Sequence, residues 1–187
     1  MATVAAAFAQ DPAWAFMLGD EYERLAPQFA GALFDARLVS GGVWVTDDLA
    51  AVAMWDPPDR SEAAVAHAQR VRARYRDLAG EAVFARHTRY DAAVARASAA
   101  GRHWYLGVLA TEVSRRGQGL ASALIAPVLE EAARLCLPCC LETSTTANRR
   151  FYERRGFTQA TDVLLRGGPP TWWLRRDPPS ATGRFAG

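Results

Sequence analysis

The sequence predicts an α/β (α+β) fold, in which helices and strands share one domain. Three observations support this prediction: a hairpin pattern over residues 43–55, a strand, glycine turn and helix over residues 103–135, and alanine-rich helical patterns between them. A chain of 187 residues is long enough for one substantial core, and no repeat or linker divides it. We therefore expect a single domain over residues 1–176 and a disordered tail over residues 177–187.

The first hundred residues alternate helical patterns with one hairpin. Asp11-Pro12 ends the first helix, because a residue that precedes proline avoids the helical conformation, and Pro27 should interrupt or kink the second helix. The hairpin turns at two aspartates and ends at two prolines, and Ser61 caps the helix that follows. The expected elements are helices over residues 2–9, 21–38, 61–79 and 81–99, and strands over residues 43–46 and 50–55.

After residue 100 a strand leads through a glycine turn into an amphipathic helix. Leu120, Leu124 and Val128 have the spacing of one apolar helix face, and Gly156 suits the C-terminal cap of a later, shorter helix. The expected elements are strands over residues 103–111, 139–144, 157–165 and 171–176, and helices over residues 120–135 and 147–155.

The segment RRGQGLAS, residues 115–122, predicts an anion-binding site. Glycine lets the backbone approach a ligand closely, and the free N–H groups at a helix start carry partial positive charge. Phosphate and pyrophosphate groups bind to such helix N-termini. Three classes of ligand therefore compete for this turn: a dinucleotide, a nucleoside triphosphate, and the pyrophosphate of coenzyme A.

The residue types around the turn separate these classes. All 22 basic residues are arginine, so the chain has no lysine for the phosphate-binding loop of ATP and GTP enzymes, nor for a Schiff base. Ser122 stands where a dinucleotide fingerprint has its third glycine, and too little chain follows to complete a doubly wound sheet. Glu142 does lie about where the ribose-binding acid of that fingerprint belongs.

Other sites and partners find little support in the sequence. CLPCC follows a helix instead of starting one, and the three histidines are scattered, so we expect buried structural cysteines and no metal site. Four arginines between residues 70 and 76 split onto two helix faces, which favours a solvated surface over nucleic-acid binding. Without a membrane-length apolar run or a signal peptide, we expect no membrane contact and a cytoplasmic protein. The composition points to a bacterial source.

Arg116, Gly119 and Ala121 match the (Q/R)-x-x-G-x-(G/A) signature of the GNAT N-acetyltransferase superfamily, which the sequence therefore resembles. The continuation LPCCLETSTTANRRFYERRGF is similar to the subgroup that contains puromycin N-acetyltransferase, as are AAFAQDP, the hairpin and PPTWWLRR. The resemblance covers most of residues 5–176. It implies a mixed, mostly antiparallel central sheet flanked by helices. The family's first strand has no counterpart in the given sequence, so either the start was placed too late or the strand over residues 43–46 becomes an exposed edge.

The resemblance also implies the reaction, which is transfer of an acetyl group from acetyl-CoA to a primary amine of a small molecule by direct attack in a ternary complex. The glycine turn would hold the pyrophosphate, and the strand before it would pair with the pantetheine arm. Asn148 and Tyr152 would share a helix face toward the sulfur. The implied cofactor-binding residues are Leu109, Thr111, Arg116, Gly117, Gln118, Gly119, Leu120, Ala121, Ser122, Asn148 and Tyr152.

Two catalytic roles follow from this reaction. Tyr152 is the expected acid for the departing thiolate, and Glu142 is the first candidate for the base that deprotonates the amine, with Glu112 second. The aromatic residues expected on the acceptor side are Trp14, Phe16 and Trp55. Two alternatives stay open: a coenzyme A-binding module without catalysis, and a nucleotide-dependent oxidoreductase. The acceptor, an antibiotic or another amine, and the oligomeric state, monomer or homodimer, are also open.

Overall fold

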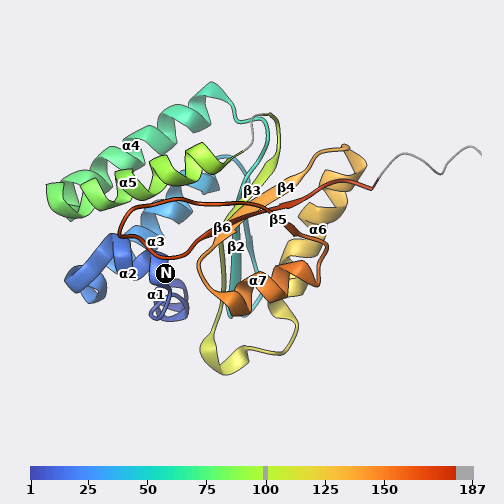
Figure 1. The fold of residues 1–187 in the computed structure, drawn as a ribbon, viewed down its shortest axis with the longest axis horizontal. Helices are drawn as coiled ribbons and strands as arrows, with labels where there is room; N and C mark the ends of the chain where they lie inside the picture. Colours follow the sequence, from blue (N-terminus) through green and yellow to red (C-terminus); the bar gives the residue numbers. More distant parts are fainter. Residues whose placement is uncertain (99–100, 180–187) are drawn as a thin grey trace, which may run out of the picture.

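The structure is a computed structural model that describes residues 1–98 and 101–179 (Figure 1). Its strands are β1 (Val43–Val45), β2 (Ala51–Asp56), β3 (Trp104–Thr111), β4 (Cys139–Thr143), β5 (Thr158–Asp162) and β6 (Trp172–Arg176). Its helices are α1 (Ala2–Ala7), α2 (Pro12–Leu18), α3 (Tyr22–Leu38), α4 (Glu62–Ala79), α5 (Glu81–Ala97), α6 (Leu120–Arg134) and α7 (Thr146–Glu153). Short 3₁₀ turns occur at η1 (Gly19–Glu21) and η2 (Val113–Arg115).

The strands form one sheet in the order β1-β2-β3-β4-β6-β5. Every neighbouring pair is antiparallel except β3 and β4, which run parallel and are connected through α6. Helices α1–α5 lie on one side of the sheet, and α6 and α7 lie on the other (Figure 1). The predicted mixed, mostly antiparallel sheet with flanking helices is confirmed.

The core lies on both faces of β2, whose first five residues are all buried. Successive side chains of a strand point to opposite faces, so Val52 and Met54 pack with α1–α5, whereas Ala53 and Trp55 pack with α6 and its neighbours. Burial on both faces explains why this strand is an uninterrupted apolar run.

A β-bulge interrupts the pairing of β2 with β3. Consecutive residues of β2 pair with Val108 and Leu106, so Gly107 has no partner opposite it. A Cβ atom at Gly107 would lie 2.4 Å from the guanidinium of Arg37, so a side chain here would displace Arg37 from its ion pair with Asp56. Bulges bend the strand that carries them, and this one lies where β3 parts from β4.

The parallel strands β3 and β4 pair only at their beginnings, through Trp104 with Cys139 and Tyr105 with Cys140. Past these pairs the strands separate, and a small cavity of about 70 Å³ lies between them. This cavity, the inner cavity, is lined from both strands and from α2 and α7. The sheet therefore opens at its centre, next to the glycine turn that follows β3.

Several boundaries differ from the predicted ones. Helix α2 has no counterpart among the predicted helices, because Asp11-Pro12 starts a helix here as well as ending one. The carboxylate of Asp11 accepts hydrogen bonds from the N–H groups of Ala13 and Trp14 at 2.9 and 3.1 Å. Pro27 lies inside α3, which continues through it as one helix. Strand β5 ends at residue 162 and its side chains are exposed, since it pairs with β6 on one side only.

The cysteines, the sheet edge and the C-terminal segment can also be compared with the predictions. Cys139 and Cys140 are buried, whereas Cys136 is exposed just after the end of α6, so the prediction of buried cysteines is wrong for this residue. Strand β1 is an edge strand with Trp44 and Val45 exposed. Residues 177–179 form neither helix nor strand, and residues 180–187 of the predicted tail lie outside the described residues, as does the end of the predicted helix over 81–99.

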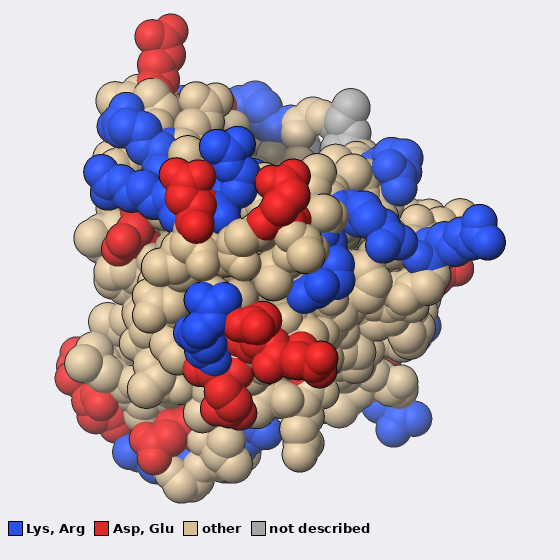
Figure 2. Space-filling model, turned by 90° about the vertical axis from the view of Figure 1, so that its left-hand side faces the viewer, with Lys and Arg blue, Asp and Glu red and all other residues tan. Residues whose placement is uncertain are grey.

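The surface formed by the N-terminal helices carries both signs of charge. Figure 2 shows basic and acidic side chains interspersed on the left-hand side of the molecule in Figure 1. Arg72 of α4, for example, forms an ion pair with Asp91 of α5 at 2.7 Å. In the part of the chain that the structure describes, none of the helices combines the length and the apolar character needed to cross a membrane.

Candidate active site

The start of α6 offers backbone N–H groups that the described residues leave unpaired. Gly119 caps this helix in the left-handed conformation (φ 84°), and within the described chain no side chain caps it and no acidic residue occupies its first turn. The first hydrogen bond into the helix runs from the Ala123 N–H to the Gly119 carbonyl at 3.0 Å. The preceding N–H groups are therefore available to an anion.

Both glycines of the turn adopt positive φ angles, 79° at Gly117 and 84° at Gly119. A Cβ atom at either position would meet no atom of the described residues within 4 Å. Protein packing therefore does not require glycine here. The backbone conformation favours glycine, and the open space in front of it belongs to a cleft.

This cleft, the large cleft, has a volume of about 720 Å³ and lies between the glycine turn, the end of β3, α7 and the α1–α2 connection. It brings together nearly all predicted cofactor-binding residues, namely Leu109, Thr111, Arg116, Gly117, Gly119, Leu120, Ala121, Ser122, Asn148 and Tyr152. Gln118 is the exception, because its exposed side chain turns to Arg115 and accepts a hydrogen bond from it at 2.8 Å.

Arginines lie along the rim of the large cleft. Arg116 donates a hydrogen bond to the carbonyl of Ala7 at 3.1 Å, and Arg155 donates one to the hydroxyl of Ser122. Burial lowers the pKa of Arg155, and the neighbouring Arg154 lowers it further. The rim arginines are Arg115, Arg116, Arg154 and Arg155. Their charge favours an anionic ligand in the cleft.

The wall of the large cleft opposite the turn includes the second half of β3. This strand pairs with β2 along its length, with Leu109 opposite Ala53 and Thr111 opposite Ala51. On its other side the pairing with β4 stops after Tyr105. The outer edge of β3 is therefore open toward the cleft, and an extended ligand arm can add to it like a strand.

Helix α7 presents the predicted tyrosine at the inner end of the large cleft. The hydroxyl of Thr145 accepts a hydrogen bond from the N–H of Asn148 at 3.2 Å and so starts the helix. Tyr152, one turn later, is buried (8 % exposed) and lines both the large cleft and the inner cavity, as Asn148 does. Burial and then the nearby Glu142 raise the pKa of Tyr152, which keeps its hydroxyl protonated.

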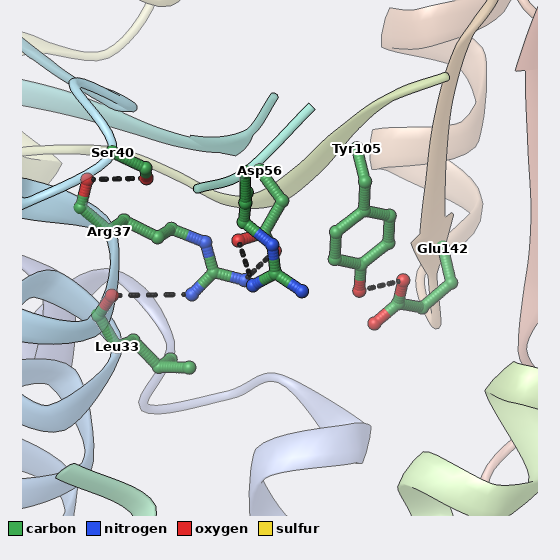
Figure 3. Close-up of polar contacts among 7 residues, drawn as sticks. Leu33, Arg37, Ser40, Asp56, Tyr105 and Glu142 are labelled. Atoms are coloured by element: carbon green, nitrogen blue, oxygen red, sulfur yellow. Dashed lines mark hydrogen bonds and ion pairs between the residues drawn. The ribbon is translucent and has the colours of Figure 1, made fainter. Parts of the chain in front are cut away.

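Glu142 lies at the opening between β3 and β4 (Figure 3). Its carboxylate accepts a hydrogen bond from the hydroxyl of Tyr105 at 2.6 Å. Burial raises the pKa of Glu142 from 4.5 to about 7, while the hydrogen bond from Tyr105 opposes this rise. A carboxyl group with this pKa exchanges a proton readily near neutral pH, as a general base must.

The inner cavity joins the two predicted catalytic groups. Tyr152, Glu142 and Asn148 line it together with Asp11 and Trp14. Tyr152 and Asp11 also line the large cleft, so the inner cavity adjoins the inner end of that cleft. The structure thus brings Tyr152 and Glu142, the two residues predicted to be catalytic, to one space next to the large cleft.

Three predicted residues lie elsewhere. Trp55 is fully buried in the core, and Phe16 packs under Arg89 (5.7 Å from ring centroid to guanidinium), next to a separate surface pocket. Neither lines the inner cavity or the large cleft, so the structure does not bring these two residues together with Tyr152 and Glu142. Trp14 does line the inner cavity. Glu112, the second candidate base, is exposed and accepts a hydrogen bond from Ser114 at 2.6 Å, away from these cavities.

The structure adds residues that the sequence did not single out. Asp11 lines both spaces, and the sequence signal for it was present as an aspartate before proline, the pattern of a helix N-cap. In the sequence, Arg155 is one of two adjacent arginines in FYERRGF, and nothing in that pattern indicates its contact with Ser122. Tyr105 pairs with Glu142 across two strands, and no local pattern indicates such a contact.

The comparisons with known proteins agree with this geometry. Residues 40–159 match the acetyltransferase (GNAT) domain family. The crystal structure of histone acetyltransferase HPA2 and related acetyltransferase from Corynebacterium glutamicum is similar, with 23% sequence identity, coverage of 97% of this chain and 91% of that chain, and a TM-score of 0.59. PH1933 from Pyrococcus horikoshii is similar at 10% identity, 94% and 88% coverage, and a TM-score of 0.55. At these identities the two structures show a shared fold alone. Because the family match covers more than half of the 187 residues, the chain belongs to the GNAT acetyltransferase family, whose members use acetyl-CoA.

Proposed function

We propose that the protein acetylates a primary amine of a small molecule, with acetyl-CoA as the donor and direct attack in a ternary complex. The observation that carries this proposal is the inner cavity, where Glu142 and Tyr152 line the same space at the end of the large cleft. The residues present fit the donor. Unpaired N–H groups at the start of α6 and the rim arginines suit its pyrophosphate, and the open edge of β3 suits its extended arm.

Acetyl-CoA supplies a thioester, and the residues of this chain supply the proton transfers. An amine reaches the site mainly as ammonium, which cannot attack until it loses a proton. The Glu142 carboxylate takes that proton, and the nitrogen forms its bond to the acetyl carbon as the carbon–sulfur bond breaks. The Tyr152 hydroxyl gives its proton to the departing sulfur, and its oxygen then takes the second proton from the acylated nitrogen. Free coenzyme A thiol and a neutral amide result, and Glu142 releases its proton to solvent.

From the sequence motifs we also propose that the protein falls in the subgroup that contains puromycin N-acetyltransferase. Those motifs lie on the donor side: the LETS strand is β4, and FYERRGF spans the end of α7. The acceptor side is less similar. We therefore expect puromycin to be acetylated poorly, with kcat/KM below about 10⁵ M⁻¹s⁻¹, the lower range of efficient enzymes. A value above this would mean that the acceptor is shared as well.

An acceptor screen that measures the release of free coenzyme A thiol tests the proposal. The panel contains antibiotics, polyamines, peptides with a free N-terminus and small arylalkylamines, each at several concentrations. Thiol release that depends on one amine, together with the mass of its acetylated product, supports the proposal. Acetyl-CoA binding without turnover on any amine would favour a coenzyme A-binding module that lacks catalysis.

A further inference from the structure

A second pocket, the α5 pocket, lies on the opposite face of the sheet from α6 and α7. Its volume is about 410 Å³, within the range of small-molecule sites. One wall is the last part of α5, another is the segment after β2, and the floor is formed by Tyr105, Glu142 and Trp173. The α5 pocket shares no lining residue with the large cleft, so donor binding in the large cleft does not explain the α5 pocket.

Glu142 is the lining residue that the α5 pocket shares with the inner cavity. Its neighbour in β4 on the same face, Cys140, packs in the cluster under α5, whereas Tyr152 packs in the core on the side of α6 and α7. Glu142 therefore lies at the opening of the sheet, between the α5 pocket and the inner cavity, which Tyr152 also lines. A molecule in the α5 pocket reaches the proposed base without passing through the donor's cleft.

The floor of the α5 pocket is aromatic. The rings of Tyr105 and Trp173 stack with their centroids 5.8 Å apart at an angle of 12°, and the His103 ring stands edge-on to Trp173 at 6.1 Å. Trp173 is 2 % exposed, and its indole N–H has no hydrogen-bond partner among the described residues. Aromatic surfaces of this kind bind flat rings and attract cations over their faces.

The carboxylates of the α5 pocket differ in how they are neutralised. Asp56 forms ion pairs with Arg37 at 2.8 Å and with Arg60 at 3.4 Å (Figure 3), and Asp91 forms one with Arg72. Glu142 takes part in no ion pair of the described residues, and its side-chain partner is the neutral hydroxyl of Tyr105. Glu142, at the floor of the pocket, is therefore the carboxylate without a cationic partner. An ammonium group bound there would supply the positive charge that Arg37, Arg60 and Arg72 supply to the other two.

We infer that the α5 pocket is the acceptor site and that it takes an arylalkyl ammonium compound, with the ring against Tyr105 and Trp173 and the ammonium at Glu142. This inference rests on the proposed function. The ammonium gives one proton to the Glu142 carboxylate, and its nitrogen forms the new bond to the acetyl carbon as the carbon–sulfur bond breaks. The sulfur leaves with the proton of Tyr152, whose oxygen then takes the second proton from the nitrogen. Donor and acceptor thus enter through separate pockets and meet at the central opening of the sheet.

Binding of 2-phenylethylammonium chloride, measured by calorimetry without acetyl-CoA, tests the site directly. The Ala95→Trp variant places a large ring in the α5 pocket from an exposed position of α5. Ala85→Trp, also exposed on α5 but lining none of these cavities, is the matched control. We expect Ala95→Trp to weaken binding at least tenfold and Ala85→Trp to change it less than twofold. Failure of the wild-type protein to bind, or equal binding by Ala95→Trp, would overturn the inference.

Two related compounds test the chemical class. 2-Cyclohexylethylammonium keeps the charge without the aromatic ring, and 2-phenylethanol keeps the ring without the charge. Each should bind several-fold more weakly than 2-phenylethylammonium, and equal affinity of either would contradict the assigned chemistry. A further test by NMR needs no variant of the pocket for the binding measurement. It follows the indole N–H signal of Trp173, which is identified by its loss from the spectrum of Trp173→Phe. This signal should shift on titration with 2-phenylethylammonium, whereas that of Trp44, on the exposed edge strand β1, should not.

Failure of the proposed function gives a different pattern. In that case acetyl-CoA stabilises neither the wild-type protein nor Ala95→Trp, or no amine in the screen releases free thiol. If acetyl-CoA stabilises both proteins equally while 2-phenylethylammonium fails to bind, the donor site stands and the assignment of the α5 pocket is wrong.

Discussion

Glu142 lies between two cavities, and burial raises its pKa to about 7. As a base it must be deprotonated, so kcat/KM should increase as the pH rises through about 7 and then level off. Glu142→Gln should lower kcat/KM roughly 10²–10⁴-fold and remove this acidic limb. The measurement is kcat/KM from pH 5 to 9. An unchanged acidic limb in the Gln variant would assign the base to another group.

The same pKa predicts how stability depends on pH. The carboxyl group has a pKa of 4.5 in the unfolded chain and about 7 in the folded one, so the folded protein binds more protons between these values. Stability therefore decreases as the pH rises from about 4.5 to 7. Relative to wild type, Glu142→Gln should be more stable at pH 8 than at pH 4, by on the order of 1–3 kcal/mol. Urea unfolding at both pH values measures this difference, and Glu112→Gln, at an exposed side chain, is the control.

The contributions of the Tyr152 ring and of its hydroxyl can be tested separately. Tyr152→Phe retains the buried ring that packs with Phe157, so acetyl-CoA affinity should change little. Loss of the proposed acid should lower kcat by roughly 10²–10³-fold. Steady-state kinetics and calorimetry with acetyl-CoA measure the two effects. A kcat within a factor of about three of wild type would leave Tyr152 with a packing role.

The start of α6 is a structural unit whose function can be tested through one glycine. A side chain at Gly119 is strained by the positive φ angle and projects into the large cleft, so Gly119→Val should abolish stabilisation by acetyl-CoA. Gly80 has almost the same φ angle, 81°, also lies at a helix start, and leaves open space for a Cβ atom away from the cleft. The ψ angle of Gly80 is 162°, a conformation that is essentially restricted to glycine, whereas that of Gly119 is −5°. Gly80→Val should therefore cost at least as much stability as Gly119→Val but retain the acetyl-CoA effect in thermal unfolding. Equal loss in both variants would mean that strain alone is responsible.

Much of each element was predictable, because local spacing determines it. The glycine turn, the apolar face of α6 and the Thr145-capped helix α7 each depend on residues within a few positions of one another. Asp11 shows the limit, because a residue before proline can end one helix and cap the next, and the sequence alone favoured the first reading. Trp55 shows another limit, since an aromatic residue suits a ligand site and a core equally well, and only the packing of α6 against β2 decides.

For the whole molecule, ligand binding and folding are linked. A ligand that binds only the folded state at 100 times its Kd stabilises it by about 2.7 kcal/mol. For a chain of this size that corresponds to a rise in Tm of roughly 5–10 °C. Acetyl-CoA at millimolar concentration should produce such a rise in a thermal unfolding scan, and NADH should not. Absence of a shift with acetyl-CoA would remove the assigned donor site.

The central opening of the sheet could be predicted from the sequence only through the family resemblance. Three features form this opening, and each depends on contacts between segments more than thirty residues apart. They are the short pairing of β3 with β4, the bulge at Gly107 and the contact of Tyr105 with Glu142. No periodicity within a window of ten or fifteen residues encodes them. For the same reason the α5 pocket, which five separate segments build, had no signal in the sequence.

The arginines on the rim of the large cleft determine whether a bound thioester can acetylate the protein itself. A thioester acylates a neutral amine held beside it, and a lysine becomes such a nucleophile when burial lowers its pKa. A guanidinium stays protonated and does not attack in this way. These 187 residues contain no lysine, and the cations around the cleft are Arg115, Arg116, Arg154 and Arg155. The site can therefore hold its reactive donor without acetylating its own binding residues, and repeated turnover leaves the positive charge of the cleft unchanged.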